Sequence, residues 1–186
     1  MSEITVWTRQ HKTVAEKIEK NGRFVADPVY AAADFGEERN ILLECYRWLA
    51  GNCPTADKRP ADAVFPVWIS LTRETIQPPQ KDFVIMELSI DETFVDRINI
   101  AKWGAVLNFS YIPSDEEDRR RHGKEMREIG ISDTEAFLSR FYPQIKADIT
   151  ASWKRLFDPS VDLGGDLCYG ITWELRKEWI RRMTGE

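Results

Sequence analysis

The sequence is poor in the residues that build metal sites and disulfide frameworks. Its 186 residues include three cysteines and two histidines, and no two cysteines have C-x-x-C spacing. Structural zinc sites need about four Cys or His ligands at short spacing, and disulfide scaffolds need an even number of cysteines. We therefore expect no metal site, and a reducing compartment, namely the cytoplasm.

Long hydrophobic runs and a basic leader are also missing. No apolar run approaches the ~18 residues needed to span a bilayer, and the opening residues MSEITVWT lack a basic segment followed by an apolar one. The net charge is −5, from 26 Lys and Arg against 31 Asp and Glu. Because no apolar run is long enough to span a bilayer, we do not expect a membrane protein. Because an acidic surface repels phosphate backbones, we do not expect nucleic acid as the main partner.

The common catalytic signatures are absent. The chain contains no G-x-x-x-x-G-K-[ST], no G-x-G-x-x-G, no G-x-S-x-G and no H-E-x-x-H. These patterns mark P-loop nucleotide sites, dinucleotide-binding turns, hydrolase nucleophiles and zinc proteases, respectively. A function must therefore be argued from less regular groups of residues.

Alternating apolar and polar residues predict several strands. The first covers 4–8, and the others cover 64–71, 82–90 and 167–175. In the second of these, Pro66 cannot donate to a sheet, so it is expected at an edge or at the start of the strand.

Capping patterns and apolar stripes predict the helices. The stretch 13–22 begins with a Thr13–Glu16 capping box and ends at Asn21-Gly22, and the stretch 37–51 carries an apolar stripe. Three further helices follow in a block from about 115 to 157. Their predicted starts are a Ser114–Glu117 capping box, a Ser132–Glu135 capping box and Pro143, and a last helix is predicted over 176–183.

These elements predict an α+β fold in a single domain over residues 1–186. We expect a small mixed or antiparallel sheet with surrounding helices and a helical block in the second half of the chain. The rhythm of strands and helices is too irregular for a doubly wound parallel sheet.

The first candidate site is the run Trp7-Thr8-Arg9-Gln10, which is expected at the end of the first strand. Arg9 offers a bidentate fork to a phosphate or carboxylate, and Trp7 offers a flat ring for stacking. The alternative is structural: Trp7 lies in the core, Thr8 caps the next turn and Arg9 pairs with a surface acid.

The second candidate is Glu174, at the end of the last predicted strand. A carboxylate there can stabilise positive charge that develops at a sugar carbon. The alternative is a glutamate in the first turn of the last helix, favoured by the helix dipole. Its rival, Glu87, is expected to face solvent, since an inward carboxylate would need a partner such as an arginine.

Other polar and aromatic residues have structural explanations. His122 and the Arg119–Arg121 triple are expected on a solvated helix face, where the acids before them compensate the arginines. Trp103, Phe109 and Tyr111 are expected to pack in the core, although they and Asn108 are also suitable walls for a cleft.

The residues also resemble a known family. The ordered motifs ITVWTRQ, YRWL, FPVWISLT, LNFSYIPSDEED, FYPQIKADITASWKRLFD and TWELRKEWI look like a bacterial family called domain of unknown function 3841. The resemblance runs from about Ile4 to Ile180. The family name implies no activity.

A more distant resemblance does imply one. A strand with polar residues at its end, a short helix closed by Asn-Gly and an extended segment are similar to the opening of ADP-ribosyltransferase-like folds. That resemblance implies NAD as the cofactor, held by Trp7, Thr8, Arg9 and Gln10, with Tyr30 or Tyr46 as the aromatic that stacks on nicotinamide. Glu174 would be the catalytic glutamate.

The resemblance is incomplete. The expected histidine is Trp7 here, and the usual [Glu/Gln]-x-Glu reads Thr172-Trp173-Glu174. The sequence therefore leaves two hypotheses. One is an ADP-ribosyltransferase-like protein that binds NAD or a related nucleotide and is active or catalytically degenerate. The other is a non-catalytic module for protein partners, with Trp103, Tyr111 and Trp179 as one exposed patch.

Overall fold

The computed structural model describes residues 2–26, 39–78 and 80–185, which form an α+β fold, as predicted. The chain divides into two compact units. The first combines Met1–Arg97 with Cys168–Glu186, and the second is Ile98–Leu167. The second unit is thus inserted in the sequence of the first, and the single domain expected from the sequence stays a prediction.

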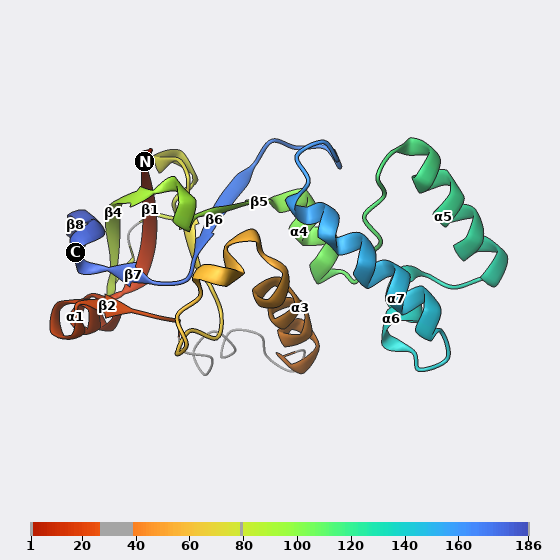
Figure 1. The fold of residues 1–186 in the computed structure, drawn as a ribbon, viewed down its shortest axis with the longest axis horizontal. Coiled ribbons are helices and arrows are strands. Elements are labelled where there is room, and N and C mark those ends of the chain that lie inside the picture. The colour runs from red at the N-terminus through yellow and green to blue at the C-terminus, as the bar shows by residue number, and fades with distance from the viewer. Residues whose placement is uncertain (1, 27–38, 79, 186) are drawn as a thin grey trace. The chain divides into compact units, whose positions relative to one another are not determined.

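The first unit is built on a six-stranded sheet with the strand order β5-β6-β3-β1-β4-β8 (Figure 1). The central strands pair antiparallel, β1 with β3 and β4, β3 with β6, and β4 with β8. The strands are β1 (Glu3–His11), β3 (Val67–Ser70), β4 (Phe83–Asp91), β5 (Asp96–Asn99), β6 (Cys168–Thr172) and β8 (Ile180–Gly185).

One face of this sheet forms the core of the first unit. Val6 on β1 and Met86, Leu88 and Ile90 on β4 are fully buried, and Ile69 on β3 joins them. The helix α1 (Lys12–Asn21) covers this face through Val14 and Ile18. The predicted alternation of β4 is therefore confirmed, and so is the place of Pro66, which directly precedes β3.

A second, two-stranded sheet joins the beginning and the end of the chain. The strands β2 (Arg23–Phe24) and β7 (Leu175–Arg176) pair antiparallel, with Arg23 opposite Arg176. The amide of Lys177 also donates to the carbonyl of Gly22, at 2.8 Å. This short pairing places residues from the two chain ends side by side near α1 (Figure 1).

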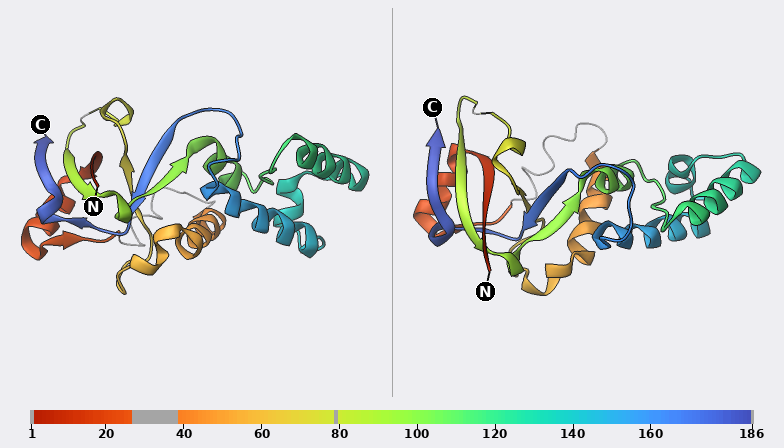
Figure 2. Two further views of the ribbon diagram at one scale, coloured as in Figure 1. Left: turned by 45° about the horizontal axis from the view of Figure 1, so that its top comes forward. Right: turned by 90° about the horizontal axis from the view of Figure 1, so that it is seen from above.

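The helix predicted over 176–183 is wrong. A short 3-10 turn, Lys177–Trp179, is followed by β8, which pairs with β4 at the edge of the sheet (Figure 2). The physical reason is tertiary: β4 would otherwise present an unpaired edge, and a run of charged residues tolerates an exposed edge strand.

Two predicted helix caps are also wrong. His11 caps α1, since its side chain accepts from the amide of Thr13, so the helix begins before the expected Thr13–Glu16 box. Asp115 caps α5 (Glu116–Ile129) by accepting from the amide of Asp118, in place of Ser114. A carboxylate is at least as good an N-cap as a hydroxyl, which explains why Asp115 caps α5 instead of the neighbouring Ser114.

The helix α3 (Arg39–Asn52) confirms the second predicted helix. Its buried face contains Leu43, Cys45, Leu49 and Ala50, whereas Ile41 is 38% exposed. The apolar stripe that the sequence predicts here consists of Ile41, Leu42, Cys45, Trp48 and Leu49, and of these Cys45 and Leu49 are buried.

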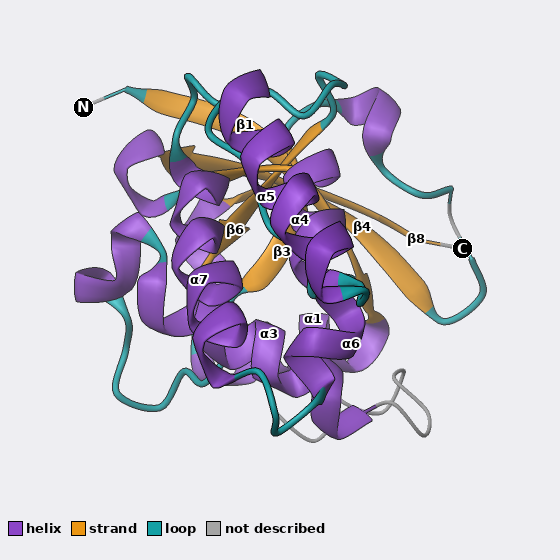
Figure 3. Cartoon of the chain, turned by 90° about the vertical axis from the view of Figure 1, so that its right-hand side faces the viewer, coloured by secondary structure: helices purple, strands orange, loops and turns teal. Residues whose placement is uncertain are grey.

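The second unit is helical (Figure 3). Its helices are α4 (Ile100–Leu107), α5, α6 (Asp133–Leu138) and α7 (Pro143–Ser152), and a 3-10 turn, Trp153–Phe157, follows α7. The Ser132–Glu135 capping box and the start at Pro143 are confirmed. The apolar stripe that the sequence predicts here, Ile145, Ile149, Trp153 and Leu156, is buried, and Phe137 stacks on Trp153 with ring centroids 5.2 Å apart.

None of the helices in the described part of the chain combines the length and the apolar character that crossing a membrane requires. The described residues likewise contain no group of three or more His, Cys, Asp or Glu arranged to hold a metal ion.

Candidate functional site

The run Trp7–Gln10 lies within β1 and not at its end, because β1 continues to His11. This corrects the sequence-based placement. The strand extends further because β4 pairs with it along its whole length, from Glu3 opposite Asp91 to His11 opposite Phe83.

Trp7 lies on the face of the sheet opposite the core residue Val6, because side chains alternate along a strand. Its indole Nε1 is 3.3 Å from Oε2 of Glu87 on β4, to which it donates. Trp7, Glu87 and Arg182 of β8 are in register on neighbouring strands and line a hollow of about 50 Å³. Glu87 lies with Trp7 on the face of the sheet that points away from the core, and it is half-buried.

The neighbours of Trp7 are held by contacts within the first unit. Thr8 is buried and donates to the Trp68 carbonyl at 3.1 Å, and Gln10 donates to the Thr8 hydroxyl at 2.8 Å. Arg9 donates to the carbonyl of Pro78 at 3.2 Å and to the side-chain oxygen of Gln77. These contacts account for the polar side chains of β1 in structural terms.

Tyr46 lies on α3 and is half-buried. Its ring meets that of Phe65 edge-on at 6.0 Å, and burial raises the pKa of its hydroxyl. Tyr30, the other expected aromatic, lies outside the described residues.

Glu174 lies between β6 and β7, where it is 6% exposed, and no helix begins there. The alternative of a first-turn glutamate is therefore wrong. Its Oε2 accepts from Nη1 of Arg23 at 2.9 Å, and its Oε1 accepts from Nε of Arg176 at 2.7 Å and lies 2.6 Å from Nη2 of the same arginine. Nη2 of Arg23 also donates to both carboxylate oxygens of Asp62, at 2.8 and 3.1 Å. The acidic partners Glu174 and Asp62 raise the pKa of the Arg23 guanidinium.

Two adjoining hollows surround this group of ion pairs. One, of about 460 Å³, is lined by Arg23, Glu174, Arg176 and Glu178, together with Asn21, Gly22 and Pro60. The other, of about 510 Å³, shares Asn21 and Arg23 with the first and adds Lys17, Phe24, Val25, Ala26 and Asp62. We call the two together the Glu174 pocket. Binding sites for small molecules are typically of this size, about 300–1,000 Å³.

The Glu174 pocket brings together residues that are 151 positions apart in the sequence. The guanidinium that meets Glu174 is that of Arg23, because β2 pairs with β7. Arg9 instead projects from β1 on the side opposite the core face that α1 covers, so the expected hollow shared by Arg9 and Glu174 is not formed. No sequence pattern marked Arg23 as a site residue, because it directly follows an ordinary helix stop and lies in a strand of two residues.

The charges of the Glu174 pocket balance. Lys17, Arg23 and Arg176 provide three cations, and three carboxylates face them: Asp62, Glu174 and Glu178. The ammonium of Lys17 also lies 5.9 Å from the ring centroid of Phe24. The arrangement therefore offers guanidinium donors, a buried carboxylate and one aromatic face to a ligand.

The structure corrects one expectation about the second unit and confirms another. His122 does not lie on a solvated face, because its side chain is 12% exposed and stacks on Tyr111. The arginines beside it are compensated as expected: Arg119 pairs with Glu116 at 3.4 Å and Arg121 pairs with Asp118 at 2.6 Å.

The aromatic patch expected for a protein-binding module is not present. Trp103 and Trp179 are 5% and 9% exposed, and Phe109, which was expected in the core, is buried. Tyr111 is half-buried. These rings therefore do not form one exposed surface.

Comparison with known proteins identifies a family. A family model described as Domain of unknown function (DUF3841) matches residues 5–181. No curated protein matches the chain, and no solved structure does.

Proposed function

Since the chain belongs to the family of domain of unknown function 3841, and the family's description states no activity, we propose a function from the geometry of the first unit. The first unit binds a nucleotide in the Glu174 pocket, and NAD is the test ligand. The observation that carries the proposal is the contact of Arg23 with Glu174 at 2.9 Å inside a hollow of ligand size.

Arg23 is suited to hold phosphate. Its side chain is 41% exposed, and it lines both hollows of the Glu174 pocket. Guanidinium groups bind phosphate oxygens in bidentate geometry. A diphosphate at Arg23 would compete with Asp62 and Glu174, and Lys17 would supply a second positive charge.

The same position of Arg23 bears on catalysis. Both oxygens of Glu174 are bound by arginines, so neither is free to stabilise an oxocarbenium-like sugar while these ion pairs persist. A phosphate that draws Arg23 away would release Oε2. The proposal of an ADP-ribosyltransferase-like reaction therefore requires that NAD binding breaks the Arg23–Glu174 pair.

The first experiment measures binding. NAD is titrated into the protein, and the heat of binding and the melting temperature are followed. A ligand at 100 times its dissociation constant adds about 2.7 kcal/mol to the free energy of unfolding. Arg23→Gln should weaken NAD binding about tenfold or more, because a charge-assisted phosphate contact contributes about 1.5–3 kcal/mol.

Arg9→Gln is the matched control. It removes a guanidinium from the same unit but from the opposite face of the sheet, and should leave NAD binding unchanged. Absence of binding at millimolar NAD, or equal effects of the two substitutions, would reject the Glu174 pocket as the nucleotide site.

A second experiment separates binding from turnover. Release of nicotinamide is measured with the native protein, with Glu174→Gln and with Glu178→Gln. An active transferase loses the release only in Glu174→Gln, whereas a catalytically degenerate protein binds NAD and releases no nicotinamide in any of the three.

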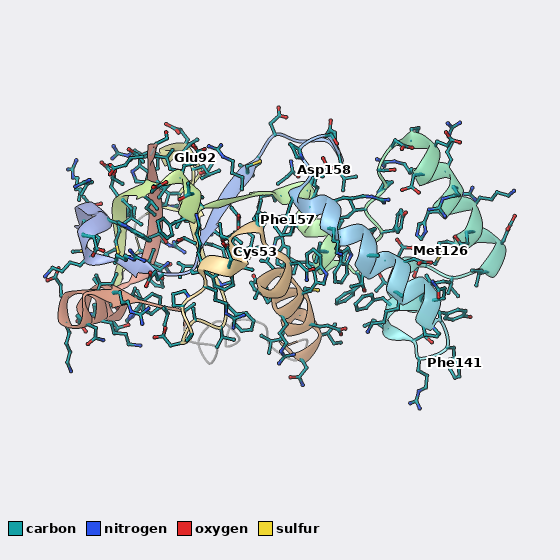
Figure 4. All side chains as sticks on the ribbon, in the orientation of Figure 1. Cys53, Glu92, Met126, Phe141, Phe157 and Asp158 are labelled. Carbon is teal, nitrogen blue, oxygen red and sulfur yellow. The ribbon has the colours of Figure 1, made fainter. Side chains whose placement is uncertain are left out.

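A protein-interaction module is the second candidate, and a different surface supports it. Phe141 is 82% exposed, and Leu138, at the end of α6, is 54% exposed. The ring of Phe141 projects away from the helices that flank it (Figure 4). A protein partner that buries the Phe141 ring should fail to bind Phe141→Ser and should still bind Arg23→Gln.

A further inference from the structure

The second unit contains a hollow of about 330 Å³ that the proposed nucleotide site does not use. Its walls come mainly from two helices. Arg121, His122 and Glu125 lie at helical spacing on α5, and Ile145, Asp148, Ala151 and Ser152 lie on one stripe of α7. Tyr111 and Arg155 complete the lining, so we call it the His122 hollow.

His122 is held in a defined tautomer. Its Nε2 lies 2.7 Å from Oδ1 of Asp133, and its ring stacks on that of Tyr111 with centroids 4.1 Å apart. A nitrogen this close to a carboxylate oxygen must carry the proton, which leaves Nδ1 of the neutral imidazole as an acceptor. No other described residue hydrogen-bonds to Nδ1, and His122 lines the hollow.

The partners of His122 are themselves fixed. The second oxygen of Asp133 accepts from the amide of Tyr111 at 2.8 Å. The hydroxyl of Tyr111 donates to Asp118, which also accepts from Arg121 and Arg155 at 2.6 and 2.9 Å. The imidazole therefore cannot turn away without breaking this network, so its free nitrogen is pre-oriented.

The two arginines of the hollow are already engaged. Arg155 donates to Asp118 and to the carbonyl of Ile112, and Arg121 donates to Asp118. The carboxylates at the mouth are less well compensated. Within the described part of the chain, Glu125 has one ion-pair partner, Arg121 at 3.7 Å, and Asp148 accepts from the side-chain amide of Gln144 at 3.1 Å.

The charges around the hollow are therefore unequal. Two arginines and the carboxylates of Glu125 and Asp148 line the hollow, and the carboxylates of Asp118 and Asp133, which pair with these arginines and with His122, add negative charge beside it. The excess of negative charge repels anionic ligands and attracts cationic ones. Nδ1 of His122 and the carboxylates of Glu125 on α5 and Asp148 on α7 can together accept hydrogen bonds from several N–H groups of one ligand.

We propose that the His122 hollow binds a primary amine in its ammonium form. Nδ1 of His122 accepts one N–H, and the carboxylates of Glu125 and Asp148 accept the others. The aliphatic part of the amine lies against Ile145 and Ala151, which line the same hollow. The site is independent of the Glu174 pocket, which lies in the other unit.

The test uses three probes of the same length and different charge: n-butylammonium, butyramide and butyrate. Each is titrated into the ¹⁵N-labelled full chain, and the His122 ring nitrogens and the amides of α5 and α7 are followed by NMR. We expect n-butylammonium to shift the Nδ1 resonance saturably, and we expect neither the neutral nor the anionic probe to do so.

Substitutions then assign the contacts. Glu125→Gln and Asp148→Asn should each weaken n-butylammonium binding about threefold to fivefold, as expected for a partly exposed ion pair. His122→Gln places an amide where Nε2 was and removes the acceptor at Nδ1, so it should abolish the binding. Glu128→Gln is the control, because Glu128 is 66% exposed on the same helix and pairs with Lys124.

Three results would overturn the proposal. They are equal shifts with butyramide or butyrate, no saturable shift with n-butylammonium, and an equal loss of binding in Glu128→Gln. Failure of NAD to bind the Glu174 pocket leaves this test unaffected, since the two sites share no residue.

Discussion

Replacing Glu174 by Gln tests whether its carboxylate stabilises the first unit. The substitution keeps the shape of the side chain and removes the charge that accepts one hydrogen bond from Arg23 and one from Arg176 and pairs with both guanidiniums. Hydrogen bonds to a charged group contribute about 1.5–3 kcal/mol each when buried. The two guanidiniums are 41% and 36% exposed, so water replaces part of what they lose.

We therefore expect Glu174→Gln to lower the free energy of unfolding by about 2 kcal/mol. Urea unfolding followed by tryptophan fluorescence measures the change through the shift in midpoint.

Glu178→Gln is the matched control for this measurement. Glu178 lines the same hollow and reaches the same Arg176, but at 4.0 Å and with 66% of its side chain exposed. Its replacement should cost less than about 0.5 kcal/mol. If Glu174→Gln costs no more than Glu178→Gln, the carboxylate of Glu174 does not hold β2 to β7.

Four further substitutions test other parts of the fold. Although burial acts in the opposite direction, hydrogen bonds from a backbone amide, an arginine and a tyrosine hold the pKa of Asp118 below its usual range. The contribution of the Asp118 carboxylate to the free energy of unfolding is therefore present at neutral pH and lost as the pH falls below about 4. Asp118→Asn should lower the free energy of unfolding by about 2 kcal/mol at pH 7, and by progressively less in unfolding titrations at acid pH. An equal loss at pH 7 and at acid pH would contradict this. Ser132→Ala removes the N-cap of α6 and should cost about 1 kcal/mol in urea unfolding. Gly170→Ala places a Cβ 2.8 Å from Ile69 and should cost about 1–3 kcal/mol, whereas Gly104→Ala meets nothing within 4 Å inside α4 and should stabilise by about 0.5–1 kcal/mol; the opposite order in thermal melts would refute the packing around β6.

Local patterns in the sequence predicted much of the fold. The alternation of β4, the capping box at Ser132 and the apolar stripe of α7 each depend on residues a few positions apart, and the structure contains all three. Helix and strand periods are local properties, so a single sequence is enough to detect them.

The features that failed depend on distant residues. The segment over 180–185 has no strong strand pattern and becomes β8 because β4 offers an edge. Arg23 meets Glu174 only because β2 pairs with β7, and His122 is buried only because Tyr111 and Asp133 enclose its ring. No residue near them in the sequence indicates these contacts, so the sequence predicted Arg9 beside Glu174, whereas the structure places Arg23 there.

The insertion of the second unit has a consequence for the order of folding. Residues 98–167 are continuous and complete their own core, whereas the sheet of the first unit needs β6 and β8 from the last part of the chain. During synthesis, β3 and β4 therefore emerge long before their outer partners and present open edges, which favour aggregation. Chains cut after residue 167 should retain a folded helical unit joined to an incomplete sheet, and are expected to become insoluble through that sheet.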